Sequence, residues 1–256
     1  MPEGDNIFVA ARTLNRALAG REILTYASDI APADLVGRTI TRVEPRGKNV
    51  LMHLDDGRVL HSHMMMSGSW HIYRPGEKWQ RPETQARIVI TTERFVAVGF
   101  NVPVASVMTE RVAEREVVAN LGPDILAAEW DRAQILARLR ARGDLSIGVA
   151  LMYQRLVAGI GNVYKSEILF ICRVDPWSLI DALDDDTLGR ILDTARALML
   201  ANLEGKRRRT REGPERVHVY GRSGKACFTC GTRVLMRRQG DQGRSTYYCA
   251  TCQGVR

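Results

Sequence analysis

Four cysteines near the C-terminus place the tightest constraint on how this chain can fold. Cys227 and Cys230 form one C-x-x-C pair, and Cys249 and Cys252 form a second pair after eighteen further residues. Two such pairs are typical of a tetrahedral site in which four thiolates hold one metal ion. Four thiolates leave no coordination position for water, so we expect one structural Zn²⁺ ion that folds the β-hairpin between the pairs and takes no part in catalysis. Iron in the same cage, or two unrelated thiol pairs, are the alternatives.

The positive charge of the chain is concentrated in the same region. The 256 residues carry a formal net charge of +8. Residues 201–256 contain 13 Lys and Arg against 4 Asp and Glu, a net of +9, whereas residues 1–200 contain 24 against 25. The densest run extends from Lys206 to Arg211. Such concentration predicts a polyanionic partner such as nucleic acid, with a solvated tail as the alternative.

Composition excludes a membrane-spanning protein and a wholly disordered one. Hydrophobic residues make up 45% of the chain, and no stretch approaches the ~18 consecutive apolar residues that a membrane span needs. The N-terminal stretch has an early acid and no basic run before an apolar one, so it does not read as a secretory signal. We therefore expect a cytoplasmic, nucleoid-associated protein with no membrane partner, and a monomer because no heptad seam is visible.

The hydrophobic pattern changes along the chain. Residues 5–19 predict an amphipathic helix with Asp5 as its cap, and short β-rich runs from Glu22 to about Phe100 predict a sandwich or barrel-like β domain. Beyond residue 121 the pattern is helical, and the basic C-terminal stretch is too poor in aliphatic residues to build its own core. We predict an α+β multidomain protein with three parts, residues 1–115, 122–205 and 206–256.

Two segments of the second half carry signals for phosphate binding. Gly159 and Gly161 form a tight turn that leads into a helix beginning at Asn162, and the N-terminus of a helix attracts phosphate. Between the cysteine pairs, Arg237, Arg238 and Arg244 accompany two tyrosines on the predicted hairpin. An arginine near a hairpin tip can enter a groove of DNA and hold phosphate, although a polar rim is an equal alternative.

The first half offers an unusual nucleophile. Removal of the initiator methionine exposes Pro2 as a secondary amine, which can condense with an aldehyde to a cationic iminium, and Glu3 stands next to it as a proton source. Lys48, one of five lysines among 32 arginines, lies in a turn that enters a strand. His63 precedes three consecutive methionines, and one of these could act as a wedge in a base stack or as core filler.

These motifs occur together and in one order over nearly the whole chain. They are PEG at the start, RGK around position 47, SHMMMSGSW, LGPD, GIGNVYKSE, VYGRSGKAC and the two C-x-x-C pairs. The set resembles the formamidopyrimidine-DNA glycosylase and endonuclease VIII family of base-excision repair enzymes. The resemblance implies an N-terminal β-sandwich with a long opening helix, a C-terminal helical domain with a helix-two-turn-helix, and a zinc-finger β-hairpin with four cysteine ligands.

The resemblance also implies roles for individual residues. Lesion removal by attack at C1′ of the nucleotide, followed by β,δ-elimination that nicks the strand, would require an extruded base. The implied roles are Pro2 as Schiff-base nucleophile, Glu3 as proton donor to the sugar ring, Lys48 as a lysine near the lesion, Asn162 and Arg244 as phosphate clamps, His63 as a further backbone contact, and Glu167 as a conformational or catalytic support.

Three departures from the family pattern favour the endonuclease VIII branch and oxidised pyrimidines as substrates. Asn6 stands where many relatives carry a glutamate, so that role is absent or passes to Asp5. Residues 98–106 lack the Arg and Phe pair of the formamidopyrimidine branch, which leaves Met66 or a neighbour as the wedge. The connection from Gly205 to Tyr220 is too short for a long lesion-capping loop.

The partner implied by the resemblance is damaged double-stranded DNA, with single-stranded or bubble DNA as a further possibility. The alternatives are a glycosylase for 8-oxoguanine and formamidopyrimidine, and a non-catalytic protein that binds damaged DNA. A zinc-dependent hydrolase is disfavoured because four cysteines close the metal site and the five histidines form no ligand cluster.

Overall fold

The computed structural model describes residues 2–204 and 207–255, which form two compact units. The first unit ends at Asn120 and the second begins at Leu121. The second unit includes both the helical segment and the C-terminal hairpin. The border predicted at 205/206, like Lys206 of the basic run, lies outside the described residues, so the three-part division stays a prediction.

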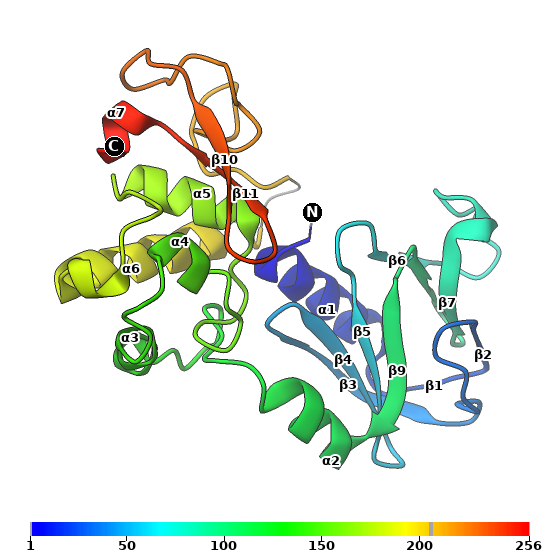
Figure 1. Ribbon diagram of the computed structural model, residues 1–256. Helices are drawn as coiled ribbons and strands as arrows, with labels where there is room; N and C mark the ends of the chain where they lie inside the picture. The colour runs from blue at the N-terminus through cyan, green and yellow to red at the C-terminus, as the bar shows by residue number, and fades with distance from the viewer. Residues whose placement is uncertain (1, 205–206, 256) are drawn as a thin grey trace. The chain divides into compact units, whose positions relative to one another are not determined.

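Two antiparallel sheets build the first unit (Figure 1). One has the strand order β1-β3-β4-β5-β9 and the other the order β2-β7-β8-β6. The strands are β1 (Arg21–Glu22), β2 (Thr25–Ser28), β3 (Thr39–Arg46), β4 (Asn49–Leu54), β5 (Arg58–His63), β6 (Ser69–Tyr73), β7 (Ala86–Thr91), β8 (Val96–Phe100) and β9 (Val104–Thr109). The predicted Asp56–Gly57 turn joins β4 to β5, and Gly57 takes the positive φ of 78° that favours glycine there. The predicted β-sandwich is confirmed.

Helix α1 (Gly4–Leu18) packs against strands of both sheets, β3 and β4 of one and β6 of the other. Its apolar stripe of Ile7, Ala11, Leu14 and Leu18 is buried in the same core as the inward residues of the sheets. The predicted opening helix is thus confirmed. Its cap differs from the prediction, because Glu3 occupies the N-cap position and Asp5 lies buried in the first helical turn.

Short helical segments cover the outer face of the first sheet, and aromatic side chains cover that of the second. Helix α2 (Glu110–Ala113) and a π-helical turn (Glu114–Val118) pack over Leu51 and Val59, so β4 and β5 are buried on both faces. The outer face of the second sheet carries an aromatic cluster beside a 3-10 turn at Glu83–Gln85. The cluster contains Tyr73, Trp79 and Phe100, and His71 contacts it.

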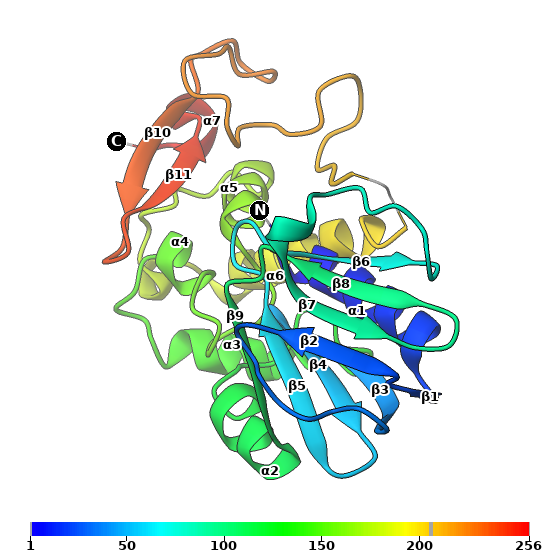
Figure 2. The same ribbon diagram turned by 90° about the vertical axis from the view of Figure 1, so that its right-hand side faces the viewer.

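Helices dominate the second unit (Figure 2). They are α3 (Arg132–Arg140), α4 (Ile147–Ala150), α5 (Asn162–Ile171), a 3-10 turn (Ile180–Ala182), α6 (Asp185–Ala201) and α7 (Ala250–Gln253). Asp131 and Asp184 cap α3 and α6 by accepting hydrogen bonds from backbone N–H groups three residues on, at 3.0 and 2.7 Å. Among the described residues, no helix is long and apolar enough to cross a membrane.

The predicted hairpin between the cysteine pairs is confirmed as β10 (Leu235–Gln239) and β11 (Arg244–Tyr248). The two strands pair antiparallel from Leu235–Tyr248 to Gln239–Arg244, which places Arg244 where the turn enters β11. Strand β11 packs against α5. The hairpin is therefore supported by packing against a helix that is buried along nearly its whole length.

Truncation of two leucines of the first unit should have very different effects on the free energy of unfolding. Leu60 on β5 is 1% exposed, whereas Leu24 is 48% exposed. We expect Leu60→Ala to lower the free energy of unfolding by about 2–5 kcal/mol, because it leaves a cavity between the sheets. The same deletion at Leu24 should change it by no more than about 0.5 kcal/mol. Chemical denaturation of the two variants checks this, and equal effects would contradict the packing described.

Candidate functional site

The N-terminus of the first unit places two predicted residues at the start of α1. Pro2 is half-buried, and Glu3 is fully buried at the N-cap, where its carbonyl accepts a hydrogen bond from Ile7 N at 3.1 Å. The positive end of the helix dipole favours a carboxylate at this position. Asp5 is also buried, whereas Asn6 is exposed. The interior carboxylate that accompanies Glu3 is therefore that of Asp5.

Lys48 lies on the tip of the β3–β4 hairpin. Gly47 and Lys48 form a two-residue turn between the paired residues Arg46 and Asn49, and Gly47 has a φ of 58°. Asn49 Nδ2 donates to Arg46 O at 3.0 Å across this turn. His61 of β5 holds the same Asn49 through its Nε2, 2.8 Å from Asn49 Oδ1. Side chains of two strands thus fix the turn that carries Lys48.

His63 lies beside this hairpin, and its surroundings favour the neutral ring. Burial and then repulsion from the Lys48 ammonium lower the pKa of His63. Its Nδ1 accepts a hydrogen bond from Met65 N at 3.0 Å, so the neutral ring carries its proton on Nε2. His63 can therefore accept at Nδ1 and donate at Nε2.

The three methionines leave strand β5, which ends at His63, and form a turn. Gly68 N donates to Met64 O at 2.8 Å, and a Cβ at position 68 would approach the same oxygen to 2.7 Å. Met64 is buried in the sandwich core, whereas Met65 and Met66 are exposed. Of these three methionines, only Met64 therefore faces the core.

In the second unit, the turn before α5 is held by a glutamine. Gly159 has a φ of 101°, and its N–H donates to Gln154 Oε1 at 3.0 Å. Gln154 Nε2 in turn donates to Ile160 O at 3.0 Å. The predicted helix start at Asn162 is confirmed, and Gln154 is a residue that the sequence did not single out.

Asn162 and Lys165 of α5 both reach the hairpin. Asn162 Nδ2 donates to Ser245 O at 2.7 Å, and Lys165 Nζ donates to Thr246 Oγ1 at 2.7 Å and to Ser245 O at 3.2 Å. Asn162 thus contacts the residue next to Arg244. The side-chain amide that the sequence assigned to phosphate is engaged with the hairpin backbone in this structure.

A buried polar chain continues from Lys165 across the hairpin to α4. Thr246 Oγ1 donates to Gln239 Oε1 at 2.8 Å, and Gln239 Nε2 donates to Ser146 Oγ at 3.0 Å and to Pro176 O at 2.8 Å. Ser146 is the N-cap residue of α4. This hydrogen-bonded chain, which we call the α4–hairpin relay, fixes the hairpin to α5, to the N-cap of α4 and to the turn at Pro176.

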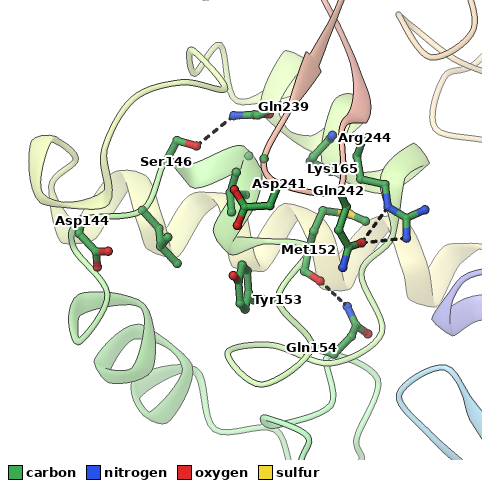
Figure 3. Close-up of a pocket in the computed structure, with 14 residues that line it drawn as sticks. Asp144, Ser146, Met152, Tyr153, Gln154, Lys165, Gln239, Asp241, Gln242 and Arg244 are labelled. Atoms are coloured by element: carbon green, nitrogen blue, oxygen red, sulfur yellow. Dashed lines mark hydrogen bonds between the residues drawn. The ribbon is translucent and has the colours of Figure 1, made fainter.

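The relay borders a cavity of about 530 Å³ (Figure 3). The first half of its wall comes from residues 144–154 around α4, and the other half from the hairpin tip at residues 239–244. Asp144, Tyr153, Lys165 and Asp241 are among the lining residues. Arg244 donates to Gln242 Oε1 from Nε and Nη2 at 3.1 and 2.9 Å. Its guanidinium is thereby held at the edge of this cavity.

Glu167 organises the segment that follows α6. Its carboxylate is fully buried and accepts from the backbone N–H groups of His218, Val219 and Tyr220 at 2.7, 2.8 and 2.8 Å. Thr210 Oγ1 donates to the same carboxylate. A single buried charge thus gathers four donors from residues 210–220, which makes it an anchor for that segment.

The four cysteine sulfurs converge on one point, all within 4.8 Å of one another. Cys227 Sγ lies 3.8 Å from Cys252 Sγ, and Cys230 Sγ lies 3.4 Å from Cys249 Sγ. Thiolates of a tetrahedral site with metal–sulfur bonds of about 2.3 Å lie about 3.8 Å apart. The four residues can therefore hold one metal ion, as the spacing predicted.

Comparison with known proteins agrees with this architecture. Residues 1–101 match the formamidopyrimidine-DNA glycosylase N-terminal domain, and residues 121–212 match the formamidopyrimidine-DNA glycosylase H2TH domain, the helix-two-turn-helix. A protein named probable endonuclease 8 2 from Streptomyces coelicolor is 42% identical over 99% of this chain and 94% of its own length. The chain belongs to the formamidopyrimidine-DNA glycosylase and endonuclease VIII family.

Two further comparisons place it within that family. The DNA-(apurinic or apyrimidinic site) lyase Nei2 of Mycolicibacterium smegmatis is 34% identical over 99% of both chains. With the Streptomyces protein, it supports the endonuclease VIII branch that the sequence indicated. The formamidopyrimidine-DNA glycosylase of Lactococcus lactis, solved with DNA containing an N7-benzyl-formamidopyrimidine lesion, has the same fold, with a TM-score of 0.83 over 98% of this chain and 99% of the other at 20% identity.

The buried His61 gives the family member described here a specific dependence on pH. Burial, with repulsion from His63, lowers the pKa of His61 from 6.5 to about 4. Below pH 6.5 the unfolded chain takes up a proton that folded His61 does not bind until about pH 4. His61 should therefore contribute a loss of stability as the pH falls from 6.5 to 4.

Denaturation at a series of pH values checks this prediction. Glutamine cannot titrate. In His61→Gln the free energy of unfolding should therefore fall less steeply with pH over this range, by up to the slope that uptake of one proton produces. Identical slopes in both proteins would show that His61 does not contribute.

Removing the Lys165 ammonium should lower the free energy of unfolding of the second unit. In Lys165→Met the Thr246 hydroxyl loses a buried donor, so we expect the free energy of unfolding to fall by about 1–3 kcal/mol. Lys225 is exposed, and Lys225→Met should change it by no more than about 0.5 kcal/mol. Chemical denaturation compares the two, and no difference between them would show that the relay adds nothing.

Proposed function

We propose that this chain is a bifunctional DNA glycosylase and AP lyase of base-excision repair that removes oxidised bases, mainly pyrimidines. The proposal rests on sequence identity to two proteins over almost the whole chain. One is 42% identical and is named as a probable endonuclease 8, and the other is 34% identical and is named as an AP lyase. The PEG start supports it from the sequence side, with Pro2 beside the buried carboxylate of Glu3.

The chemistry begins at the N-terminal amine. After loss of the initiator methionine, the secondary amine of Pro2 attacks C1′ of the damaged nucleotide. Glu3 gives a proton to the sugar ring oxygen, the ring opens, and departure of the base leaves an iminium between Pro2 and C1′. The iminium withdraws electrons from C2′, so C2′ loses a proton and β-elimination expels the 3′ phosphate. A second elimination then expels the 5′ phosphate, and hydrolysis frees Pro2.

Three residues of the first unit serve the substrate around this centre. Lys48, on its fixed turn, supplies an ammonium close to the lesion. His63 donates from Nε2 to a backbone phosphate, because its Nδ1 is occupied by the Met65 N–H. Met66 enters the space left by the extruded base, since a thioether is apolar and adapts to an irregular gap.

In the second unit, Arg244 and Asn162 act as the phosphate clamp. Arg244 provides a forked donor at the edge of the hairpin tip, and it exchanges its two hydrogen bonds with Gln242 for bonds to phosphate. Asn162 contributes by holding Ser245, the neighbour of Arg244, in place at the N-terminus of α5. Glu167 supports the same region by fixing residues 218–220. The partner is damaged duplex DNA, and single-stranded or bubble DNA is a second substrate form to test.

The four cysteines hold one structural Zn²⁺ ion, which would fasten the two ends of the β10–β11 hairpin. Thiolates are the preferred donors of zinc, and the sulfur spacings fit a closed tetrahedral site. We expect chelation to release one Zn²⁺ per chain, to weaken DNA binding, and to leave the helices of the second unit largely folded. Metal analysis and circular dichroism before and after chelation measure this. Full affinity without metal would contradict the structural role.

Glu3→Gln separates the two activities. Base removal needs an acid to open the sugar ring, whereas an abasic site is a hemiacetal that is already in equilibrium with a ring-opened aldehyde. We therefore expect Glu3→Gln to slow base removal by about 10²–10⁴-fold and to leave abasic-site nicking much less affected. Glu77→Gln, at an exposed position, is the control. Equal losses on both substrates would remove Glu3 from this role.

A panel of duplexes, each with one defined lesion, tests the proposal as a whole. Strand scission is expected at abasic sites and oxidised pyrimidines, with phosphate on both new ends. Preference for 8-oxoguanine would assign the chain to the formamidopyrimidine type of activity. Tight binding of damaged duplex without any scission would replace the enzyme by a non-catalytic DNA-binding protein.

A further inference from the structure

The turn at Met64–Gly68 holds two thioethers in solvent beside one in the core. Met65 is 48% exposed and Met66 is 68% exposed, whereas the adjacent Met64 is 3% exposed. Exposed methionines are unusual because a thioether is apolar and is normally used to fill cores. One short turn of the protein thus exposes two neighbouring thioethers to solvent.

The backbone prevents the two exposed side chains from withdrawing. Met64 is anchored in the sandwich core, Met65 N is bonded to His63 Nδ1, and Gly68 N closes the turn on Met64 O. Met65 has a φ of 47°, a left-handed conformation that a long side chain rarely adopts. The turn therefore keeps both side chains on its solvent-exposed side.

Exposed thioethers react with peroxides in a balanced two-electron step. The sulfur attacks one peroxide oxygen, the O–O bond breaks, an S–O bond forms, and the remaining oxygen leaves as water, or as an alcohol from an organic hydroperoxide. The sulfur is oxidised and the peroxide is reduced. The sulfoxide is polar and can be reduced again by a thiol-dependent methionine sulfoxide reductase.

We propose that Met65 and Met66 are a reversible methionine-oxidation site through which hydroperoxides switch off the removal of stacked bases. The proposal rests on the proposed function, in which Met66 fills the place of the extruded base. A polar sulfoxide is a poor filler for a gap between stacked bases, so extrusion of a paired lesion becomes less favourable. An abasic site has no base to extrude, so nicking there depends less on the wedge.

Other methionines of the chain provide internal references. Met236 on β10 is 42% exposed, so it should be oxidised as readily as Met65. Met64 should remain reduced while the fold is intact, because its sulfur lies in the core. The position of oxidation, and not its extent, should therefore decide the loss of activity.

The test uses the purified full chain treated with graded hydrogen peroxide. Peptide mass mapping gives the sulfoxide at each methionine, and base removal and abasic-site nicking are measured on the same samples. We expect base removal to fall by about tenfold or more as Met65 and Met66 become oxidised, with a smaller change in nicking. Methionine sulfoxide reductase should restore base removal.

Two variants make the assignment specific. Met236→Leu should respond to peroxide as the parent protein does. Met65→Leu/Met66→Leu keeps apolar side chains of similar size that cannot form a sulfoxide, so peroxide should not lower its base removal below its own untreated level. Loss of zinc thiolates is monitored by metal analysis of every sample.

Three outcomes would overturn the inference. These are full base removal with both sites oxidised, loss of base removal with both sites reduced, and an equal peroxide response in the double-leucine variant. The activity of the untreated protein distinguishes failure of this inference from failure of the proposed function. If the untreated protein cuts no damaged or abasic duplex, the proposed function itself fails, and this inference fails with it.

Discussion

Helix α5 buries a cation and an anion within one turn, and the C-terminal part of the second unit is positioned by them. Lys165 is nearly inaccessible and donates to β11, while Glu167 accepts four hydrogen bonds from residues 210–220. Burying either charge without its partners would cost several kcal/mol, so the hairpin and the preceding segment are strongly favoured in this arrangement. A region too poor in aliphatic residues for a core of its own is thereby held by polar contacts and four thiolates.

In the first unit, the sandwich core positions the residues to which we assign the chemistry. The sandwich core holds Met64 and the helix α1. The turn after Met64 carries the exposed Met66, and the start of α1 carries the half-buried Pro2. Lys48 and Met66 lie on turns fixed by hydrogen bonds of His61, His63 and Asn49. Lowered pKa values favour the neutral form of both histidines, and the neutral ring is the form in which His63 Nδ1 can accept from Met65 N.

Local signals were sufficient for much of this structure. The period of apolar residues located α1, the glycines before Asn162 located the start of α5, and the cysteine spacing located the hairpin. Each of these features is encoded within a few consecutive residues. The cap of α1 was predicted two residues too late, because Asp5 is a good cap residue by type, whereas the helix begins at Gly4 with Glu3 as its N-cap.

Contacts across long sequence separations were not accessible to such reasoning. The bond that the Asn162 amide donates to Ser245, eighty-three residues away, was not predicted, and the phosphate role of Asn162 stays a prediction. Lys165 and Gln239 were not singled out, although their relay fixes the hairpin. The scarcity of lysine among 32 arginines was a usable signal for Lys165, since a buried ammonium and a guanidinium are not interchangeable.

The central claim is that the N-terminal amine of Pro2 forms the covalent bond to DNA. Borohydride reduction of the zinc-loaded protein on a duplex with one abasic site, followed by mass mapping of the crosslinked peptide, tests it directly. The account predicts one irreversible adduct, on Pro2, and none when a residue is left in front of Pro2. An adduct on Lys48 would contradict the assigned nucleophile, and no adduct from protein that binds the duplex would contradict the lyase itself.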